Sequence, residues 1–220
     1  MMEREIEVKL LANSPELLTE IGARSELAGV PLTPTGERIQ EDTYLDTPGF
    51  DLLRAGFSLR HRRRDGKTKA TLKSIPSRND RALLRDRTEI EEMISDGAGA
   101  TVAGGRIEEV VRAAIGDLGL HPVVRIRTER HTFQVGAEPG SGAVLGADQA
   151  RVYPGVGDEP VFGFLEIEVE DAGGGRGLLE RAGNELMDEY GLRPSSLSKF
   201  ERGLQALGRL EQARGEEGAP

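Results

Sequence analysis

Charged and apolar residues alternate with a period of two along several stretches of the chain. In the first stretch Glu5, Glu7 and Lys9 fall on one face, while Val8 and Leu10 fall on the other. Because successive side chains of a β-strand point to opposite sides, this alternation predicts strands with one polar and one apolar face. The predicted strands span residues 3–10, 38–45, 57–64, 67–74, 83–93, 123–135, 143–153 and 162–170.

Helices are predicted in the segments that lie between and after these strands. They span residues 15–27, 107–118, 178–190 and 199–209, with a short helical turn at 50–55. Ser14 followed by Pro15 predicts a helix start, because Ser can cap the first turn and Pro suits the first helical position. Asp65-Gly66 predicts a tight hairpin turn between two strands.

Two glycine-rich segments and the C-terminal tail are predicted to lack regular structure. Residues 96–105 and 135–142 are interpreted as loops, and 212–220 as a disordered tail. Neither a repeat nor a linker divides the chain. We therefore predict one α+β domain over residues 1–205, built mainly on an antiparallel sheet, and a helix end with a disordered acidic tail over 206–220.

The composition narrows the chemistry that the chain can perform. The 220 residues include no cysteine, which excludes disulfides, zinc–thiolate sites and thiol nucleophiles. Only 4% are aromatic, so platforms for stacking nucleic-acid bases are scarce. The net charge of −9 disfavours broad attraction to nucleic acid or anionic lipid. The basic run at 60–64 is a candidate nucleic-acid patch, but its strand–turn–strand context makes that interpretation secondary.

The sequence also predicts the cellular location of the protein and shows how rarely it uses lysine. The N-terminus is acidic, and no apolar run approaches the roughly 18 residues that a membrane helix needs. We expect a cytoplasmic monomer or homodimer that binds neither nucleic acid nor membranes. Lysine supplies only a minority of the 29 basic residues, so each lysine stands out against arginine as the default cation.

Rows of charge recur on one side of most predicted strands, opposite apolar residues. Beyond the first strand, the rows are Arg60, Arg62 and Arg64; Lys69, Thr71 and Lys73; Arg85, Arg87, Glu89 and Glu91; Arg125, Arg127 and Glu129; and Glu166, Glu168 and Glu170. Because helices are available to cover the apolar side, this pattern permits an inverted barrel with a charged lumen. Unpaired buried ions are costly, so such a lumen must hold counter-charges, water and a ligand.

The signs of these charges indicate the class of ligand. Three strands carry paired carboxylates, and the remaining rows are rich in arginine and lysine. Hard divalent cations prefer carboxylate oxygens and water, whereas arginine and lysine bind phosphate. A triphosphate that carries Mg²⁺ or Mn²⁺ satisfies both sets of side chains.

The segment Glu5-Ile6-Glu7-Val8-Lys9 resembles the ExExK signature of the CYTH superfamily, also called triphosphate tunnel metalloenzymes. Further segments follow in the order of that family, at residues 42–47, 52–62, 71–73, 87–91, 125–127, 148, 165–168 and 198–203. The resemblance covers roughly residues 3–203. It implies an eight-stranded antiparallel β-barrel, or tunnel, covered outside by helices, that binds triphosphates together with divalent metals.

The resemblance also implies roles for particular residues. The metal-binding acids would be Glu5, Glu7, Glu89, Glu91, Asp148, Glu166 and Glu168. The phosphate clamp would consist of Lys9, Arg60, Arg62, Lys73, Arg87, Arg125, Arg127 and Lys199. Lys9, with Tyr44, could assist the departing phosphate, although Tyr44 is equally plausible as a core residue. Glu170 and Arg64 remain interpretable as surface charges, and Arg85 and Arg130 as ion-pair partners.

The resulting hypothesis is a hydrolase that uses Mg²⁺ or Mn²⁺, with two ions, to release the terminal phosphate of a small triphosphate. Inorganic triphosphate is the first choice, because the sequence shows no aromatic cluster for a thiazole or pyrimidine ring and no nucleoside pocket. The alternatives are a class IV-type adenylyl cyclase or a thiamine triphosphatase on the same fold. A non-enzymatic alternative is a binding module for polyphosphate or nucleotides.

Overall fold

The computed structural model describes residues 3–75, 83–94, 105–138 and 140–215. Its strands are β1 (Glu3–Ala12), β2 (Glu26–Leu27), β3 (Val30–Asp46), β4 (Phe57–Arg64), β5 (Lys67–Ser74), β6 (Leu84–Ile94), β7 (His121–Glu138), β8 (Ser141–Pro154), β9 (Phe162–Asp171) and β10 (Arg193–Pro194). Its helices are α1 (Pro15–Gly22), α2 (Asp51–Arg54), α3 (Gly105–Ile115), α4 (Arg176–Tyr190), α5 (Lys199–Ala206) and α6 (Leu210–Arg214).

Eight of the strands form a closed antiparallel barrel. They are hydrogen-bonded in the order β1–β6–β5–β4–β3–β7–β8–β9, and β1 pairs with β9 to close the ring. The short strands β2 and β10 extend the sheet beside β3 and β1. The structure confirms the predicted α+β class and the eight-stranded barrel.

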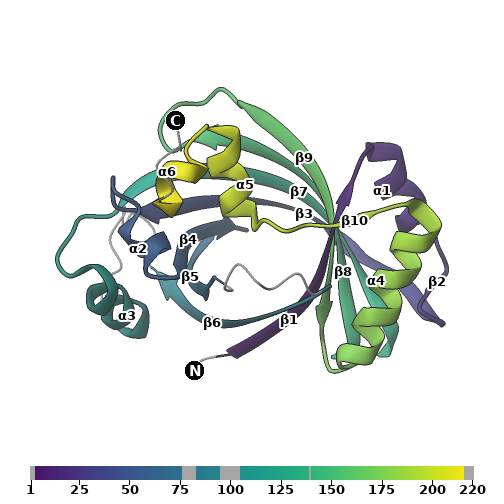
Figure 1. Ribbon diagram of the computed structural model, residues 1–220. Coiled ribbons are helices and arrows are strands. Elements are labelled where there is room, and N and C mark those ends of the chain that lie inside the picture. Colours follow the sequence, from purple (N-terminus) through teal and green to yellow (C-terminus); the bar gives the residue numbers. More distant parts are fainter. Residues whose placement is uncertain (1–2, 76–82, 95–104, 139, 216–220) are drawn as a thin grey trace.

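Helices cover the outside of this barrel (Figure 1). α1 and α4 pack against β1, β8 and β9, whereas α2 lies against β3 and β4, and α3 against β5 and β6. α5 contacts β7 and β8, and α6 packs against α5 and α2.

Most of the hydrophobic core lies between the barrel wall and these outer helices. On one side, Val8 and Ile167 of the wall pack with Leu179 of α4, and all three side chains are fully buried. On another side, a second cluster joins β3–β6 to α3. Burying one large aliphatic side chain contributes about 1.5–3 kcal/mol, so the outward faces stabilise the barrel. The inward faces are thereby free to carry charge.

A third apolar cluster differs, because it closes one end of the lumen. Val124 and Ile126 of β7 pack against Phe200 and Leu204 of α5. The N-terminal turn of α5 therefore lies at the end of the barrel, where its side chains reach the interior.

Two predicted boundaries were wrong near the N-terminus. The helix predicted over 15–27 ends at Gly22, and Glu26–Leu27 forms β2 because Leu27 is buried and pairs with Val30. β3 begins at Val30 rather than at residue 38. Prolines within residues 30–34 obscure the strand pattern, and the register shift at Pro34 accommodates them.

Two segments predicted to be irregular contain regular structure. The loop predicted over 135–142 belongs largely to β7 and β8, which continue through a register shift between Val135 and Glu138. The helix predicted over 199–209 ends at Ala206, and α6 follows within the expected tail. Residues 96–104 of the other predicted loop and 216–220 of the tail lie outside the described residues.

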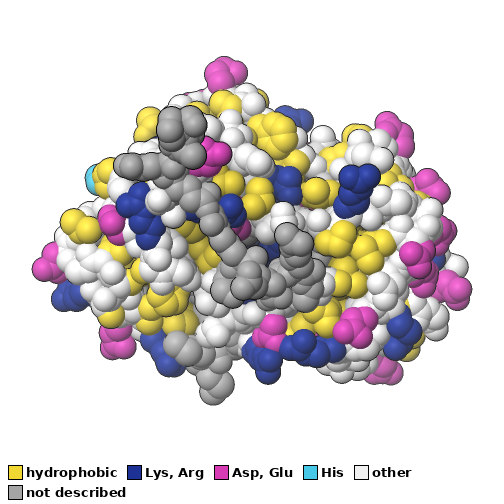
Figure 2. Space-filling model, viewed as in Figure 1, with side chains coloured by type: hydrophobic (Ala, Val, Ile, Leu, Met, Phe, Trp, Pro, Cys, Tyr) yellow, Lys and Arg dark blue, Asp and Glu magenta, His cyan; other side chains and the backbone are white. Residues whose placement is uncertain are grey.

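The outer surface carries both signs of charge. On the face shown in Figure 2, Lys and Arg side chains lie among Asp and Glu side chains rather than in one continuous basic area. Every helix in the described ranges is too short or too polar to cross a membrane.

Candidate functional site

The lumen contains a charged cavity of about 220 Å³. Its walls come from β1, β3, β4, β5, β6, β7, β9 and α5. The lining includes Glu5, Glu7, Lys9, Tyr44, Arg60, Arg62, Lys73, Arg87, Glu89, Glu91, Arg130, Glu168, Glu170, Lys199 and Phe200. Residues from distant parts of the sequence therefore meet in one polar space, as the alternating rows of charge predicted.

Three acids from β8 and β9 converge on Lys199. One carboxylate oxygen each from Asp148, Glu166 and Glu168 lies within 4.8 Å of the others. Lys199 Nζ lies 2.8 Å from Asp148 Oδ2 and 2.7 Å from Glu168 Oε1, and it also pairs with Glu166. Burial alone lowers the pKa of a lysine, but these carboxylates hold the pKa of Lys199 well above its usual value. Lys199 therefore stays protonated.

Lys9 connects this acid cluster to β1. Its Nζ lies 2.7 Å from Glu168 Oε1 and 3.5 Å from Glu7 Oε1. Glu7 also pairs with Arg87 of β6. Burial opposes ionisation of Glu7, but Lys9 and Arg87 outweigh it and lower the pKa of Glu7 to about 2. Glu7 is therefore a carboxylate at any physiological pH.

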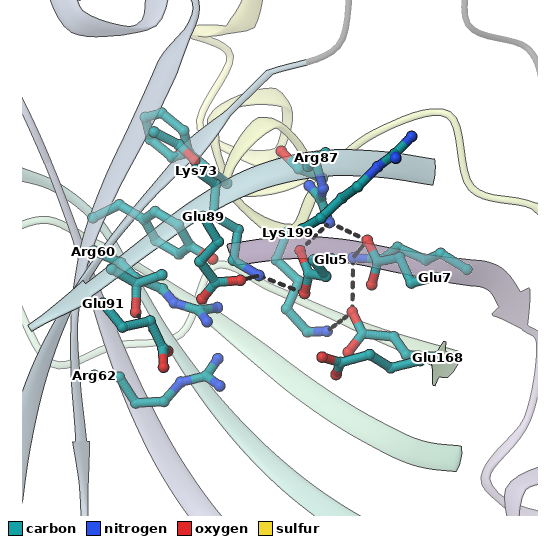
Figure 3. A pocket seen from close by; sticks show the side chains of 18 of the residues that line it. Glu5, Glu7, Arg60, Arg62, Lys73, Arg87, Glu89, Glu91, Glu168 and Lys199 are labelled. Atoms are coloured by element: carbon teal, nitrogen blue, oxygen red, sulfur yellow. Dashed lines mark hydrogen bonds and ion pairs between the residues drawn. The ribbon is translucent and has the colours of Figure 1, made fainter. Parts of the chain in front are cut away.

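Another pair of acids meets Lys73 of β5. Lys73 Nζ lies 2.6 Å from Glu5 Oε1 and 2.9 Å from Glu89 Oε2. Figure 3 shows Arg60 and Arg62 extending from β4 toward the side of the cavity that holds Glu5, Glu7 and Glu168. A ligand in the cavity would therefore lie between an arginine-bearing wall and an acid-bearing wall.

The donor set of the acid wall fits a hard divalent cation. Carboxylate oxygens are the ligands that Mg²⁺ and Mn²⁺ favour. Glu166 Oε2 is a buried oxygen that has no hydrogen-bond partner within the described part of the chain. Glu5 Oε2 also accepts no hydrogen bond there, although Arg87 Nη2 lies 3.5 Å from it. An unpartnered buried carboxylate oxygen is unfavourable by itself and is satisfied when it accepts a cation or a proton.

The local structure of α5 holds Lys199 in this position. Ser198 Oγ accepts from the backbone N–H of Glu201, and Glu201 Oε2 accepts in return from the backbone N–H of Ser198, which forms a capping box. Glu201 Oε1 also accepts from Arg214 of α6 at 2.7 Å. The segment before the helix is fixed to β1 because the backbone N–H of Ser195 donates to the carbonyl of Lys9.

Close approach of α5 to β7 depends on Gly203. A Cβ at position 203 would lie 2.5 Å from Val124 Cγ1, a distance that real Cβ contacts do not show. We expect Gly203→Ala to lower the free energy of unfolding by about 1–3 kcal/mol through overpacking, although Gly→Ala normally stabilises a helix. Thermal unfolding measures this change.

The matched control for this substitution is Gly177→Ala in α4. A Cβ at position 177 would lie no closer than 3.7 Å to a neighbouring side chain, so this variant should be neutral or stabilised. Equal unfolding temperatures for the two variants would show that α5 is not held against β7.

The structure places most of the predicted site residues in or beside the cavity. Asp148 and Glu166 are fully buried behind Lys199 and contact it directly. Glu91 lies at the exposed side of the cavity, where its carboxylate pairs with Lys69 at 2.7 Å. Tyr44 lines the cavity and stacks on Phe200 with ring centroids 4.9 Å apart, so it contacts both the cavity and the apolar core, and its role toward the leaving group stays a prediction.

The prediction that Arg125 and Arg127 face the lumen was wrong. In the β3–β7 register Arg125 pairs with Thr43 and Arg127 with Glu41, whereas Ile126 pairs with Asp42, which contacts the lumen arginines. Arg125 and Arg127 lie in an outer groove, where they reach Asp158 and Glu129 respectively, each at 3.1 Å.

The physical reason is the apolar end of the lumen. In the sequence, Val124 and Ile126 predict that their face of β7 packs against an outer core. The charged row at 125, 127 and 129 would then face the lumen. In the structure Val124 and Ile126 do face a core, but that core is formed with α5 at the end of the lumen. The lumen row of β7 consequently continues through Thr128 to Arg130.

Two functional candidates were not selected from the sequence. Arg130 was interpreted only as an ion-pair partner, but it lines the cavity and binds Asp148 in a bidentate pair, with both N–O distances at 2.6 Å. Asp42 belongs to a recognised segment but received no role, and it contacts both Arg60 and Arg62. Arg130 shares strand parity with Val124 and Ile126, so the sequence pattern assigns it to the apolar row. Its place in the lumen follows only from the observed register, in which it pairs with Asp148.

The fold and the site together define a closed antiparallel β-barrel with a charged tunnel. The CYTH domain family matches residues 3–204, and the chain belongs to this family. The family predicted from the ExExK segment and the later motifs is thereby confirmed.

Solved structures share this fold. The protein HpAC1 from Hippeastrum, studied as an adenylyl cyclase and described as having a dominant triphosphatase activity, is 22% identical with a TM-score of 0.69 over 91% of this chain and 95% of that chain. A Bacillus halodurans protein described as a candidate adenylate cyclase is 20% identical with a TM-score of 0.64, over 91% and 97% of the two chains. No curated protein matches the chain significantly.

Proposed function

We propose that this protein is a divalent-metal-dependent hydrolase of triphosphate compounds, with inorganic triphosphate as its preferred substrate. The observation that carries the proposal is the cavity in which an acid cluster faces a set of arginine and lysine side chains. Membership in the CYTH family and the triphosphatase activity described for the Hippeastrum protein support the same reaction class. The absence of a nucleoside pocket from the sequence pattern favours the inorganic substrate.

The cations of the cavity would bind the phosphoryl oxygens. Arg60, Arg62 and Arg130 present guanidinium groups that can donate to phosphate oxygens. Arg62 and Arg130 would do so with the N–H groups that Asp42 and Asp148 leave free. Lys73 and Lys199 supply compact positive charges at the acid wall. Fixed donors of this kind stabilise the charge that shifts among the phosphoryl oxygens during transfer.

The acid wall would hold Mg²⁺ or Mn²⁺. Glu5, Glu7, Asp148, Glu166 and Glu168 are the candidate metal-binding acids, and Glu89 and Glu91 would hold a second ion or its waters. A bound divalent ion supplies Lewis-acid polarisation of phosphoryl oxygens and activates water.

Lys9 and Tyr44 would act on the leaving group in different ways. Burial opposes the charge of Lys9, but Glu168 and Glu7 raise its pKa, so Lys9 stays charged and stabilises the departing phosphate. Burial and the nearby Asp42 carboxylate raise the pKa of Tyr44, so its hydroxyl keeps its proton and can donate a hydrogen bond.

A substrate panel tests this proposal. Phosphate release is measured from tripolyphosphate, thiamine triphosphate and ATP, with Mg²⁺ and with Mn²⁺. We expect kcat/KM for tripolyphosphate to exceed the other values by at least about tenfold, a ratio within the range that binding contacts provide. Removal of the metal with EDTA should abolish turnover. Absence of turnover of tripolyphosphate with either metal would reject the proposed function.

The other outcomes identify the alternatives. Formation of cyclic AMP from ATP would indicate a class IV-type adenylyl cyclase, because a hydrolase that releases the terminal phosphate yields only ADP and phosphate from ATP. A preference for thiamine triphosphate would indicate a thiamine triphosphatase. Tight metal-independent binding of polyphosphate without hydrolysis would indicate a binding module.

A further inference from the structure

Asp42 is a fully buried carboxylate beside the cavity. It lies on β3 directly opposite Arg62 of β4. Arg62 Nε donates to Asp42 Oδ1 at 2.6 Å, and Arg62 Nη2 donates to Asp42 Oδ2 at 2.7 Å. Arg60 Nη1 lies 3.7 Å from the same Oδ2. One acid therefore contacts both arginines of the β4 wall.

The charge of Asp42 is secured by these contacts. Burial alone would raise its pKa, but Arg62 and Arg60 outweigh burial and lower the pKa of Asp42 to about 2. Two guanidinium groups at alternate positions of one strand share a face and repel each other. A carboxylate that contacts both offsets this repulsion, so the two arginines can stay side by side at the cavity.

The contacts also decide which donors remain for a ligand. The Nε–Nη2 edge of Arg62 is occupied by Asp42, so Nη1 remains available for the cavity. Arg60 Nε is buried and has no partner among the residues that the structure describes. Both side chains extend into the cavity in Figure 3. Arg60 and Arg62 therefore line the same cavity.

We propose that Asp42 is a positioning residue, which orients Arg60 and Arg62 so that their free N–H groups engage the same triphosphate. This inference rests on the proposed function for its substrate. Asp42 does not itself bind phosphate, because an anion would repel it. Its contribution is made through orientation of the pair, and misplacement of catalytic groups by small distances has large effects on rate.

The test compares Asp42→Asn with Glu41→Gln. Glu41 is the next residue of β3 and pairs with Arg63, the next residue of β4, but this pair lies on the outer, exposed face. Each substitution removes one carboxylate charge from a cross-strand Asp/Glu–Arg pair on the same two strands. Only the Asp42 pair borders the cavity.

The rate measurement separates positioning from affinity. With tripolyphosphate and Mg²⁺, Asp42→Asn should lower kcat about 10- to 100-fold, because orientation is lost. KM should stay within about threefold, because both guanidinium charges remain. Glu41→Gln should stay within about twofold of wild type in both constants. Rates are expressed per binding site, with the number of sites taken from calorimetric titration with metal-free tripolyphosphate.

A second measurement does not depend on turnover. In NMR spectra of arginine side chains, the Nε–Hε signal of Arg62 should be protected from exchange in wild type and in Glu41→Gln, and should lose that protection in Asp42→Asn. Unchanged arginine signals would overturn the positioning role even if wild type hydrolyses nothing. If the Asp42→Asn preparation has fewer binding sites but an unchanged rate per site, Asp42 has only a structural role. That result would also overturn the proposal.

Discussion

Glu168→Gln is expected to lower kcat/KM for tripolyphosphate about 1,000-fold, at the upper end of what loss of one preorganised electrostatic group costs. Glu168 Oε1 lies 2.7 Å from both Lys9 Nζ and Lys199 Nζ, and its other oxygen pairs with Arg130. A single carboxylate thus holds cations from β1, α5 and β7. It also belongs to the acid cluster that would bind the metal.

Loss of the Glu168 charge affects both the cations that Glu168 contacts and the acids that would bind the metal. A neutral amide would leave the three cations with one carboxylate fewer, and removing one partner of a buried ion pair costs about 3–5 kcal/mol. The amide is also a poorer ligand for a hard divalent ion. We expect the affinity for Mn²⁺, measured by calorimetry without substrate, to fall about 10- to 100-fold.

The control for this prediction is Glu129→Gln on the outer face of β7. The carboxylate of Glu129 lies 3.1 Å from Arg127 on the outer face of β7. A surface ion pair of this kind contributes little to stability. The activity and the Mn²⁺ affinity of the Glu129→Gln variant should stay within about twofold of wild type. Circular dichroism shows whether Glu168→Gln folds, and a folded variant with normal Mn²⁺ affinity would contradict the role of Glu168 in metal binding.

The barrel could be predicted because its charge pattern repeats along many strands. Glu5, Glu7 and Lys9 occupy alternate positions, and a period of two assigns them to one face whatever the strand pairs with. The same argument correctly placed Arg60, Arg62 and Lys73 in the lumen. Strand parity is a local property, so it can be derived from the sequence alone.

Contacts that depend on distant segments could not be derived in this way. Lys199 reaches Asp148 only because α5 enters the end of the barrel, which its capping box and Gly203 permit. The same entry gives Val124 an apolar neighbour inside the lumen. Val124 and Ile126 therefore face inward, opposite to the rule that holds for the other charged strands, whereas Phe133 and Val135 of the same strand pack in the outer cluster.

Arg130→Met and Arg127→Met provide the most direct test of this reassignment. Arg130 lines the cavity, forms a bidentate pair with the fully buried Asp148 and also binds Glu168. Its loss removes a phosphate-binding group and leaves buried carboxylates with fewer partners. We expect kcat/KM for tripolyphosphate to fall about 100-fold, the scale seen when one preorganised donor is removed.

Arg127→Met should retain activity within about twofold, because Arg127 contacts Glu129 in the outer groove and not the cavity. Arg130→Lys should recover little, because an ammonium group cannot form the two parallel bonds that a guanidinium makes with a carboxylate. Steady-state phosphate release from the folded variants measures both effects. Comparable losses for the residue 127 and residue 130 variants would mean that the outer groove takes part in the reaction. Full activity of Arg130→Lys would mean that position 130 contributes charge alone, without the geometry of the bidentate pair.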